Sequence, residues 1–270
     1  MSHKPIIGCV PYLNARPLIA YFETAEGAEV ADLVLAPPSV LAGMIERGEV
    51  DVALASSFFV LEKPDYAVAP ACGISSQGYV ESVRLFSKKP FDQIESLALD
   101  QSSMTSNALA QILLRERYGT APEAAAMPPS LSEMIEQNDA AVLIGDAGMS
   151  SEADGLQVLD LGAVWNEMTG LPFVWALWIG QQERVTPHVV AILKEAKRFG
   201  SQRIEEVAKS EAERLEMTYS RALRYLAEVI DYDLTDRHWS GLAHFAILCR
   251  KHGFIGADAL PPIAGEAHVG

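Results

Sequence analysis

Polar groups that could bind a small anion follow four apolar segments of the sequence. These groups are Asn14–Arg16, Ser56–Ser57, Ser102–Asn107 and Gly145–Asp146. Each comes directly after a short apolar run that is typical of a buried strand. Because small ligands of open α/β sheets bind beyond the carboxyl ends of the strands, we expect these four groups to line one cleft.

The run Ser103, Met104, Thr105, Ser106, Asn107 has the composition of an anion-binding helix start. Its hydroxyls and N–H groups suit a carboxylate or phosphate, and the helix dipole favours negative charge there. A simple N-cap needs one such residue, whereas five of the six residues from Ser102 to Asn107 are polar. For Asn14, Arg16 and Gly145–Asp146, ordinary turn formation is an open alternative.

Common catalytic motifs are absent from the sequence. It contains no Gly-x-Gly-x-x-Gly, no P-loop, no Gly-x-Ser-x-Gly elbow and no metal-ligand spacing. The six histidines lie outside the four polar groups, at His3, His188, His238, His244, His252 and His268. We therefore expect no cofactor, no metal and no histidine base. The groups present would orient a substrate and stabilise charge rather than transfer protons.

These polar groups must be positioned by two successive αβ series. In the first, the expected strands cover residues 6–10, 31–36, 50–55, 66–70 and 79–87, and the expected helices cover 16–23 and 38–48. In the second, strands are expected at 94–100, 140–148 and 174–179, and helices at 107–118 and 130–138. Helical spacing then continues over 188–215, 220–229 and 236–252, before a tail at 256–270 that we expect to fray.

This order of elements predicts an α/β protein of two lobes, with the type II periplasmic-binding-protein-like fold. We expect residues 1–86 and 184–270 to form lobe 1 and residues 87–183 to form lobe 2. The helical C-terminal segment would pack back on lobe 1. Two chain crossings between the lobes form a hinge, and hinge closure around a small ligand is common in this architecture.

Composition and charge limit the partners of the chain. The 270 residues carry a formal net charge of −15 without a cluster of Lys and Arg, so nucleic acid and anionic membranes are poor partners. An anionic ligand would have to be recruited locally, by helix N-termini and one or two arginines. An apolar fraction of 49% is enough for a sizeable core.

The sequence also favours a cytoplasmic location. No segment is long enough to span a membrane, and no secretory cleavage site follows the first apolar run. Cys9, Cys72 and Cys249 form no CxxC pair, so we expect reduced, buried thiols, although one disulfide stays open as an alternative. A monomer and a homodimer are equally compatible with the sequence.

Four segments resemble the chorismate dehydratases of the futalosine route of menaquinone biosynthesis. They are Gly8–Pro17, Gly78–Val83, Ser103–Ser106 and Thr169–Val174, and the resemblance extends over nearly the whole chain. It implies the bilobal binding-protein fold. It also implies that water is eliminated from chorismate, a dianion, to give 3-[(1-carboxyvinyl)oxy]benzoate.

The resemblance also implies roles for particular residues. Asn14 and Ser82 match active-site positions of the family and would orient the substrate, whose own enolpyruvyl carboxylate would act as the base. The substrate-binding candidates are Tyr12, Arg16, Ser56, Arg84, Ser103, Met104, Thr105, Ser106, Asn107, Gly145, Asp146, Thr169 and Gly170. Arg16 and Arg84 are candidate counter-charges, although Arg84 could equally be a solvated hinge residue. The aromatic residues Trp165, Phe173 and Trp175 could wall the substrate ring or simply belong to the core.

Other functions fit the same pattern. The 1,4-dihydroxy-6-naphthoate synthase of the same pathway shares the fold but is expected to use a cleft histidine, and no histidine occurs between His3 and His188. A solute-binding protein of a transporter is expected to carry an export signal, which this sequence lacks. A ligand sensor is expected to carry a DNA-binding or signalling segment, and none is attached.

Overall fold

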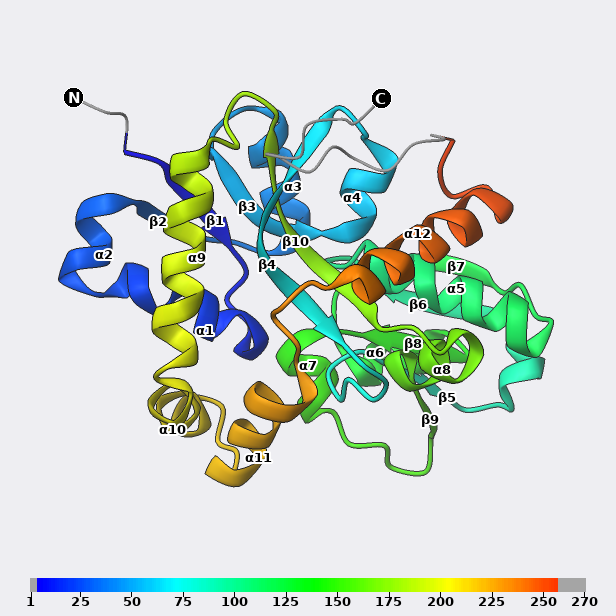
Figure 1. Cartoon of the computed structure of the whole chain (residues 1–270). Helices are drawn as coiled ribbons and strands as arrows, with labels where there is room; N and C mark the ends of the chain where they lie inside the picture. The colour runs from blue at the N-terminus through cyan, green and yellow to red at the C-terminus, as the bar shows by residue number, and fades with distance from the viewer. Residues whose placement is uncertain (1–3, 257–270) are drawn as a thin grey trace.

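Two five-stranded sheets form the centres of two lobes in the computed structural model, which describes residues 4–256 (Figure 1). The first sheet has the strand order β2 (Asp32–Leu35), β1 (Ile6–Cys9), β3 (Val52–Ser56), β10 (Phe173–Gln181) and β4 (Tyr66–Ser76). Strand β1 runs parallel to β2 and β3, whereas β10 is antiparallel to β3 and β4. All five residues of β3 are buried, as expected for a central strand covered on both faces.

The second sheet repeats this plan. Its strand order is β7 (Glu123–Met127), β6 (Ser96–Asp100), β8 (Ala140–Leu143), β5 (Arg84–Ser87) and β9 (Gln157–Asp160). Strand β6 is parallel to β7 and β8, and β5 is antiparallel to β8 and β9. The two αβ lobes expected from the sequence are therefore present.

Helices connect and cover the strands (Figure 1). The helices before β4 are α1 (Arg16–Ile19), α2 (Ala25–Val30), α3 (Pro38–Glu46) and α4 (Ser57–Glu62), with the 3₁₀ turns η1 (Leu13–Ala15) and η2 (Ala20–Glu23). The second lobe contains η3 (Phe91–Gln93), α5 (Thr105–Tyr118), α6 (Leu131–Gln137), α7 (Gly145–Ser150) and α8 (Leu161–Thr169). The C-terminal helices are α9 (Pro187–Ser201), α10 (Ile204–Arg214), α11 (Tyr219–Arg224), the π-helical turn η4 (Tyr225–Val229) and α12 (Asp236–Lys251).

Local sequence signals explain where several of these helices begin and end. Pro38 stands at the first position of α3, where its missing N–H costs nothing. Helix α5 ends at Gly119, which adopts the left-handed conformation with φ +70°. Thr186 caps α9 by accepting a hydrogen bond from the N–H of Val189.

The chain crosses between the sheets at residues other than the expected 86/87 and 183/184. Strand β5 already pairs with β8 and β9 in the second sheet, and β10 pairs with β3 and β4 in the first. The crossings thus lie between β4 and β5 and between α8 and β10. An apolar run such as β10 fits the hydrophobic pattern of either sheet, so the sequence alone does not show which strands it pairs with.

Three sequence expectations about elements were wrong in detail. Only Arg84–Ser87 of the expected strand 79–87 is a strand, because the chain turns at Glu81, which has φ +66°. The expected strand 140–148 ends at Leu143 and is followed by α7. Among the C-terminal helices, α9 packs on α1 and β4, but α12 contacts α5 of the second lobe as well as β10. Most of the tail expected to fray, residues 257–270, lies outside the described residues.

No helix within residues 4–256 combines the length and the apolar character that a membrane span requires. Cys9, Cys72 and Cys249 are all buried and unpaired, as expected for reduced thiols.

Candidate active site

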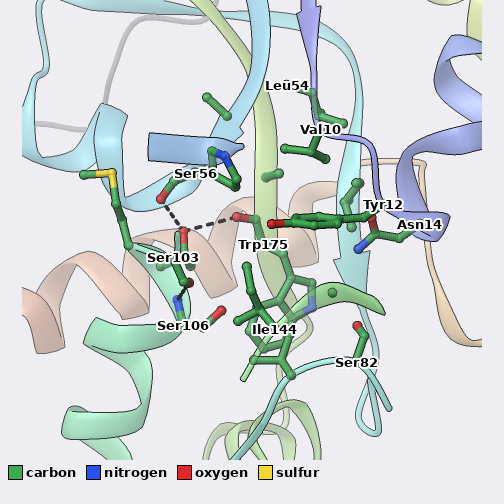
Figure 2. A pocket seen from close by; sticks show the side chains of 18 of the residues that line it. Val10, Tyr12, Asn14, Leu54, Ser56, Ser82, Ser103, Ser106, Ile144 and Trp175 are labelled. Carbon is green, nitrogen blue, oxygen red and sulfur yellow. Dashed lines mark hydrogen bonds between the residues drawn. The ribbon is translucent and has the colours of Figure 1, made fainter. Parts of the chain in front are cut away.

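A pocket with an empty volume of about 580 Å³ lies between the two sheets (Figure 2). The segments that follow β1, β3, β6 and β8 meet there, as the carboxyl-end rule for parallel strands predicts. Its polar lining is Tyr12, Asn14, Ser56, Ser82, Ser103, Thr105 and Ser106. Its remaining lining is Val10, Pro38, Leu54, Ala55, Ile74, Val80, Val83, Met104, Ile144, Gly145, Trp175 and Ala176.

The structure brings together most of the residues that the sequence singled out. Figure 2 shows Tyr12 and Asn14 reaching the pocket from one side and Ser103 and Ser106 from the other. Of the remaining lining, the sequence singled out Met104, Gly145 and Trp175. The other apolar residues were missed, because single apolar residues of strands give no signal that distinguishes a pocket wall from core.

Arg16 and Arg84 do not line the pocket. The guanidinium of Arg16 pairs with Glu211 at 2.9 Å and with Glu23 at 2.8 Å. Arg84 donates to the carbonyl oxygens of Gly148, Met149 and Ser151 at the end of α7, at 2.5, 3.1 and 2.7 Å. Both arginines thus stabilise the protein structure, and neither stands as a counter-charge inside the pocket.

Four further candidates also lie outside the lining and stabilise its surroundings. Asn107 donates to the carbonyl oxygens of Asp100 and Ser103, at 2.8 and 2.6 Å, and so fixes the turn before α5. Asp146 accepts from the N–H of Leu13 at 3.0 Å. Thr169 donates to the carbonyl oxygen of Trp165, and Gly170 ends α8 with φ +68°.

The three aromatic candidates divide between pocket and core. Trp175 lines the pocket, and its indole N–H donates to the Ser76 hydroxyl at 3.0 Å. Trp165 and Phe173 pack against each other and against Phe245, with ring centroids 4.9 to 6.3 Å apart. Only Trp175 is placed to contact a bound ring.

Asn14 is held by its backbone while its amide faces the pocket. It lies in η1, where Tyr232 donates to its carbonyl oxygen at 3.0 Å and the preceding N–H binds Asp146. Its Oδ1 atom is buried and has no hydrogen-bond partner among the described residues. A buried amide oxygen without a partner is costly, so a donor on a bound ligand would satisfy it.

Ser82 lies on the loop that crosses from β4 to β5. The carboxylate of Asp160 accepts from the N–H groups of Val80 and Glu81, at 3.1 and 2.8 Å, and so holds this loop at the N-terminus of α8. Burial raises the pKa of Asp160. The Ser82 hydroxyl accepts a hydrogen bond from Tyr225, at 2.7 Å. No sequence signal pointed to Tyr225, which stands among residues of helical spacing far along the chain.

Direct contacts close the two lobes around the pocket. The hydroxyls of Ser56 and Thr105 lie 2.5 Å apart, and Thr105 also donates to the carbonyl oxygen of Trp175 at 3.2 Å. The Tyr12 ring lies against Gly145, where an added Cβ would be 3.0 Å from the ring. The structure is therefore a closed form of the cleft.

The lining of the pocket carries almost no titratable group. Among the described residues it includes no Asp, Glu, Lys, Arg, His or Cys, and burial raises the pKa of its only tyrosine, Tyr12. Within residues 4–256 no cluster of three or more metal-ligating side chains occurs. Positive potential comes instead from the start of α5, whose first-turn N–H groups point toward the pocket end of the helix. Such a site can bind an anion and stabilise developing charge.

Comparisons with known proteins identify the family of the chain. A family model described as menaquinone biosynthesis matches residues 5–251. A chorismate dehydratase from Thermus thermophilus is 32% identical over 260 residues, which cover 89% of this chain and 93% of that protein. A chorismate dehydratase from Campylobacter jejuni is 28% identical over 160 residues, which cover 57% and 59% of the two chains.

Solved structures show the same fold at low identity. A protein from Archaeoglobus fulgidus has a TM-score of 0.73 at 19% identity, and the match covers 94% of this chain and 99% of that one. The alkanesulfonate-binding protein from Xanthomonas axonopodis has a TM-score of 0.70 at 14% identity, with 95% of each chain covered. These similarities confirm the bilobal periplasmic-binding-protein-like fold.

Proposed function

The chain belongs to the menaquinone biosynthesis family, and from this membership we infer that it is a chorismate dehydratase. Such a hydro-lyase converts chorismate into 3-[(1-carboxyvinyl)oxy]benzoate and water. The Thermus thermophilus relative, which matches along nearly the whole of both chains, supports this activity. The observation on this chain that carries the proposal is a closed pocket lined by neutral hydrogen-bonding groups at a helix start.

The chemistry requires charge stabilisation more than proton transfer by the protein. The hydrogen at C3 of chorismate is a vinylogous neighbour of the ring carboxylate, so its removal spreads negative charge onto that carboxylate. The hydroxyls of Ser103 and Ser106 and the start of α5 suit this charge. One of these N–H groups, that of Ser106, is already bound by the Ser103 hydroxyl at 3.3 Å. The ring carboxylate would therefore lie at the N–H groups that remain.

The base is the enolpyruvyl carboxylate of the substrate itself. No carboxylate, imidazole or amine of the described residues lines the pocket, whereas the substrate brings a carboxylate close to its own C3. The C3–H bond breaks and its proton moves to this carboxylate. The C3 electrons form the new ring double bond as the C4–O bond breaks, and the departing hydroxide takes back the proton from the enolpyruvyl carboxyl and leaves as water. The aromatic ring that results favours the products.

Asn14 and Ser82 orient the substrate for this elimination. The unpartnered Oδ1 of Asn14 accepts a hydrogen bond from the C4 hydroxyl, which fixes the ring in the pocket. The hydroxyl of Ser82 donates to the C4 oxygen as negative charge develops on it. Trp175 forms the wall against which the ring lies.

Two alternative functions fit the structure less well. A dihydroxynaphthoate synthase is expected to use a cleft histidine, but the described histidines, at positions 188, 238, 244 and 252, do not line the pocket. A solute-binding protein shares the fold, so it is distinguished by experiment: it would bind chorismate and return it unchanged.

The test is incubation of the purified chain with chorismate, with products separated by chromatography and identified by mass. We expect a product lighter than chorismate by one water, and we expect its rate to fall at least about 100-fold in Asn14→Ala. Asn138→Ala is the matched control, because this amide binds the carbonyl oxygen of Met134 on α6, outside the pocket. Thermal stabilisation by chorismate without turnover would indicate a binding protein instead.

We also propose that the protein acts in the cytoplasm. Cys9, Cys72 and Cys249 are unpaired and buried, which fits a reducing compartment. Cell fractionation with an antibody against the chain tests this location directly.

A further inference from the structure

Tyr225 connects the two residues that the proposed reaction uses most directly. Its phenol is 1% exposed and donates a hydrogen bond to the Ser82 hydroxyl at 2.7 Å. The side chain of Asn14 also lies close to the phenol oxygen of Tyr225: burial raises the pKa of Tyr225, and a hydrogen bond with Asn14 partly offsets that rise. Tyr225 does not line the pocket itself, so it stands behind the two residues that do.

The backbone around Tyr225 is specialised for this contact. Tyr225 opens η4, a π-helical turn in which the N–H of Ile230 binds the carbonyl oxygen of Tyr225 at 3.0 Å. The wider turn packs against η1, the short element that carries Asn14. Single π-helical turns inside helical segments occur frequently at functional sites, because they re-aim one side chain. Here the re-aimed side chain is a tyrosine directed at the loop between the lobes.

The hydrogen bond from Tyr225 determines which way the Ser82 proton points. A hydroxyl has one proton to donate and two lone pairs. When Tyr225 fills one lone pair, the serine proton is left to point elsewhere, and Ser82 lines the pocket. Burial raises the pKa of Tyr225, so the phenol stays protonated at neutral pH and continues to donate. The serine is thereby kept as a donor toward bound substrate.

Other contacts fix the backbone of this loop but leave the serine hydroxyl free to rotate. Asp160 holds the N–H groups of Val80 and Glu81. Glu81 pairs with Arg221 and with Arg224 of α11, the helix directly before Tyr225. These hydrogen bonds and ion pairs fix the position of the loop. Of the contacts described, only the one from the phenol of Tyr225 reaches the hydroxyl of Ser82.

We propose that Tyr225 is a positioning residue of the dehydration, which orients the Ser82 hydroxyl toward the leaving oxygen of the substrate. This inference rests on the proposed function. Because the oriented hydroxyl matters most when charge develops on that oxygen, removal of the phenol hydroxyl lowers kcat and leaves KM nearly unchanged.

The experiment is a double-mutant cycle on the full chain, with turnover of chorismate as the readout. Tyr225→Phe should lower kcat about tenfold, the effect of about 1.4 kcal/mol, with KM changed less than about threefold. Ser82→Ala should lower kcat further, and the double variant Tyr225→Phe with Ser82→Ala should be no slower than Ser82→Ala alone. Tyr21→Phe is the control, because Tyr21 is also buried and packs on Phe22 and Phe199 away from the pocket.

The outcomes distinguish the role of Tyr225 from the dehydratase activity itself. Losses that multiply in the double variant, a kcat of Tyr225→Phe within twofold of wild type, or a loss carried by KM would overturn the inference while the proposed function stands. A folded wild-type chain that leaves chorismate unchanged would overturn the proposed function and the inference together. If Tyr225→Phe does not fold, fluorotyrosine at position 225 retains the hydroxyl and alters its acidity. In that case an unchanged kcat would overturn the inference.

Discussion

The hydroxyls of Ser56 and Thr105 lie 2.5 Å apart and join the two lobes at the wall of the pocket. Ser56 ends β3 of the first sheet, and Thr105 begins α5 of the second lobe. Thr105 also donates to the carbonyl oxygen of Trp175. A hydroxyl shared in this way holds the two lobes together at the wall of the pocket.

Thr105→Val should weaken substrate binding through loss of this closure. Valine retains the shape of threonine but leaves the Ser56 hydroxyl and the Trp175 carbonyl without their partner, which costs about 1 to 2 kcal/mol in the closed form. We expect KM to rise about tenfold with a smaller change in kcat, measured by steady-state turnover of chorismate. Thr120→Val is the control, since Thr120 donates to the carbonyl oxygen of Ile94 outside the pocket. Equal effects of the two variants would contradict a role in closure.

Gly145→Ala should impair activity because it separates the lobes. Gly145 has φ +58°, and an added Cβ would meet the Tyr12 ring at 3.0 Å. Gly119→Ala is a close control, because Gly119 has φ +70° and nothing within 4 Å of its added Cβ. Both variants should lose about 1 kcal/mol of unfolding free energy from backbone strain. Only Gly145→Ala should lose kcat/KM, by about tenfold or more. If Gly145→Ala were as active as Gly119→Ala, the close contact between Gly145 and the Tyr12 ring would not be required for activity.

Asn14→Asp should exclude the dianion from the pocket. The pocket wall offers no cationic side chain among the described residues, so an added carboxylate would face the substrate charges without compensation. We expect KM to rise at least about 100-fold at neutral pH, with partial recovery as pH falls and the new carboxyl takes up a proton. Steady-state turnover measures KM, and binding isotherms at two pH values measure the affinity for chorismate. Unchanged affinity at neutral pH would argue that Asn14 does not face the substrate.

The value of kcat/KM for chorismate should be nearly independent of pH near neutrality. No described histidine lines the pocket, so no group with a pKa near 6.5 should control kcat/KM. Burial raises the pKa of Tyr12 above its ordinary value near 10, so this phenol stays protonated as pH rises and is lost as a donor only beyond that value. We expect a flat profile from about pH 6 to about pH 9. A bell-shaped profile with a limb near neutrality would instead reveal a base supplied by the protein.

Much of this site could be predicted from the sequence, because polar residues after apolar runs mark the carboxyl ends of strands. That rule correctly predicts that Asn14, Ser56, Ser103 and Ser106 line one pocket. The rule could not place residues whose role depends on their partners. The sequence pattern favours Arg16 as a counter-charge, but its guanidinium pairs with the carboxylates of Glu23 and Glu211.

The fold was predicted less well where the chain passes between the lobes. The sequence of β10 is uniformly apolar, and such a run fits the centre of either sheet. Glu81 adopts a left-handed conformation that is uncommon outside glycine, so its turn could not be expected from residue type. Tyr225 likewise gives no sign of its role, because a π-helical turn has no distinct spacing in sequence.

We expect this pocket to remove water from chorismate without a base of its own. The most direct measurement compares the rate of aromatic product from chorismate with the rate from its ester at the enolpyruvyl carboxylate, each resolved by chromatography and mass. We expect conversion of chorismate to 3-[(1-carboxyvinyl)oxy]benzoate and no conversion of the bound ester. Unchanged chorismate with a folded protein would contradict the dehydratase assignment, and equal rates for the two compounds would contradict the role of the substrate as base.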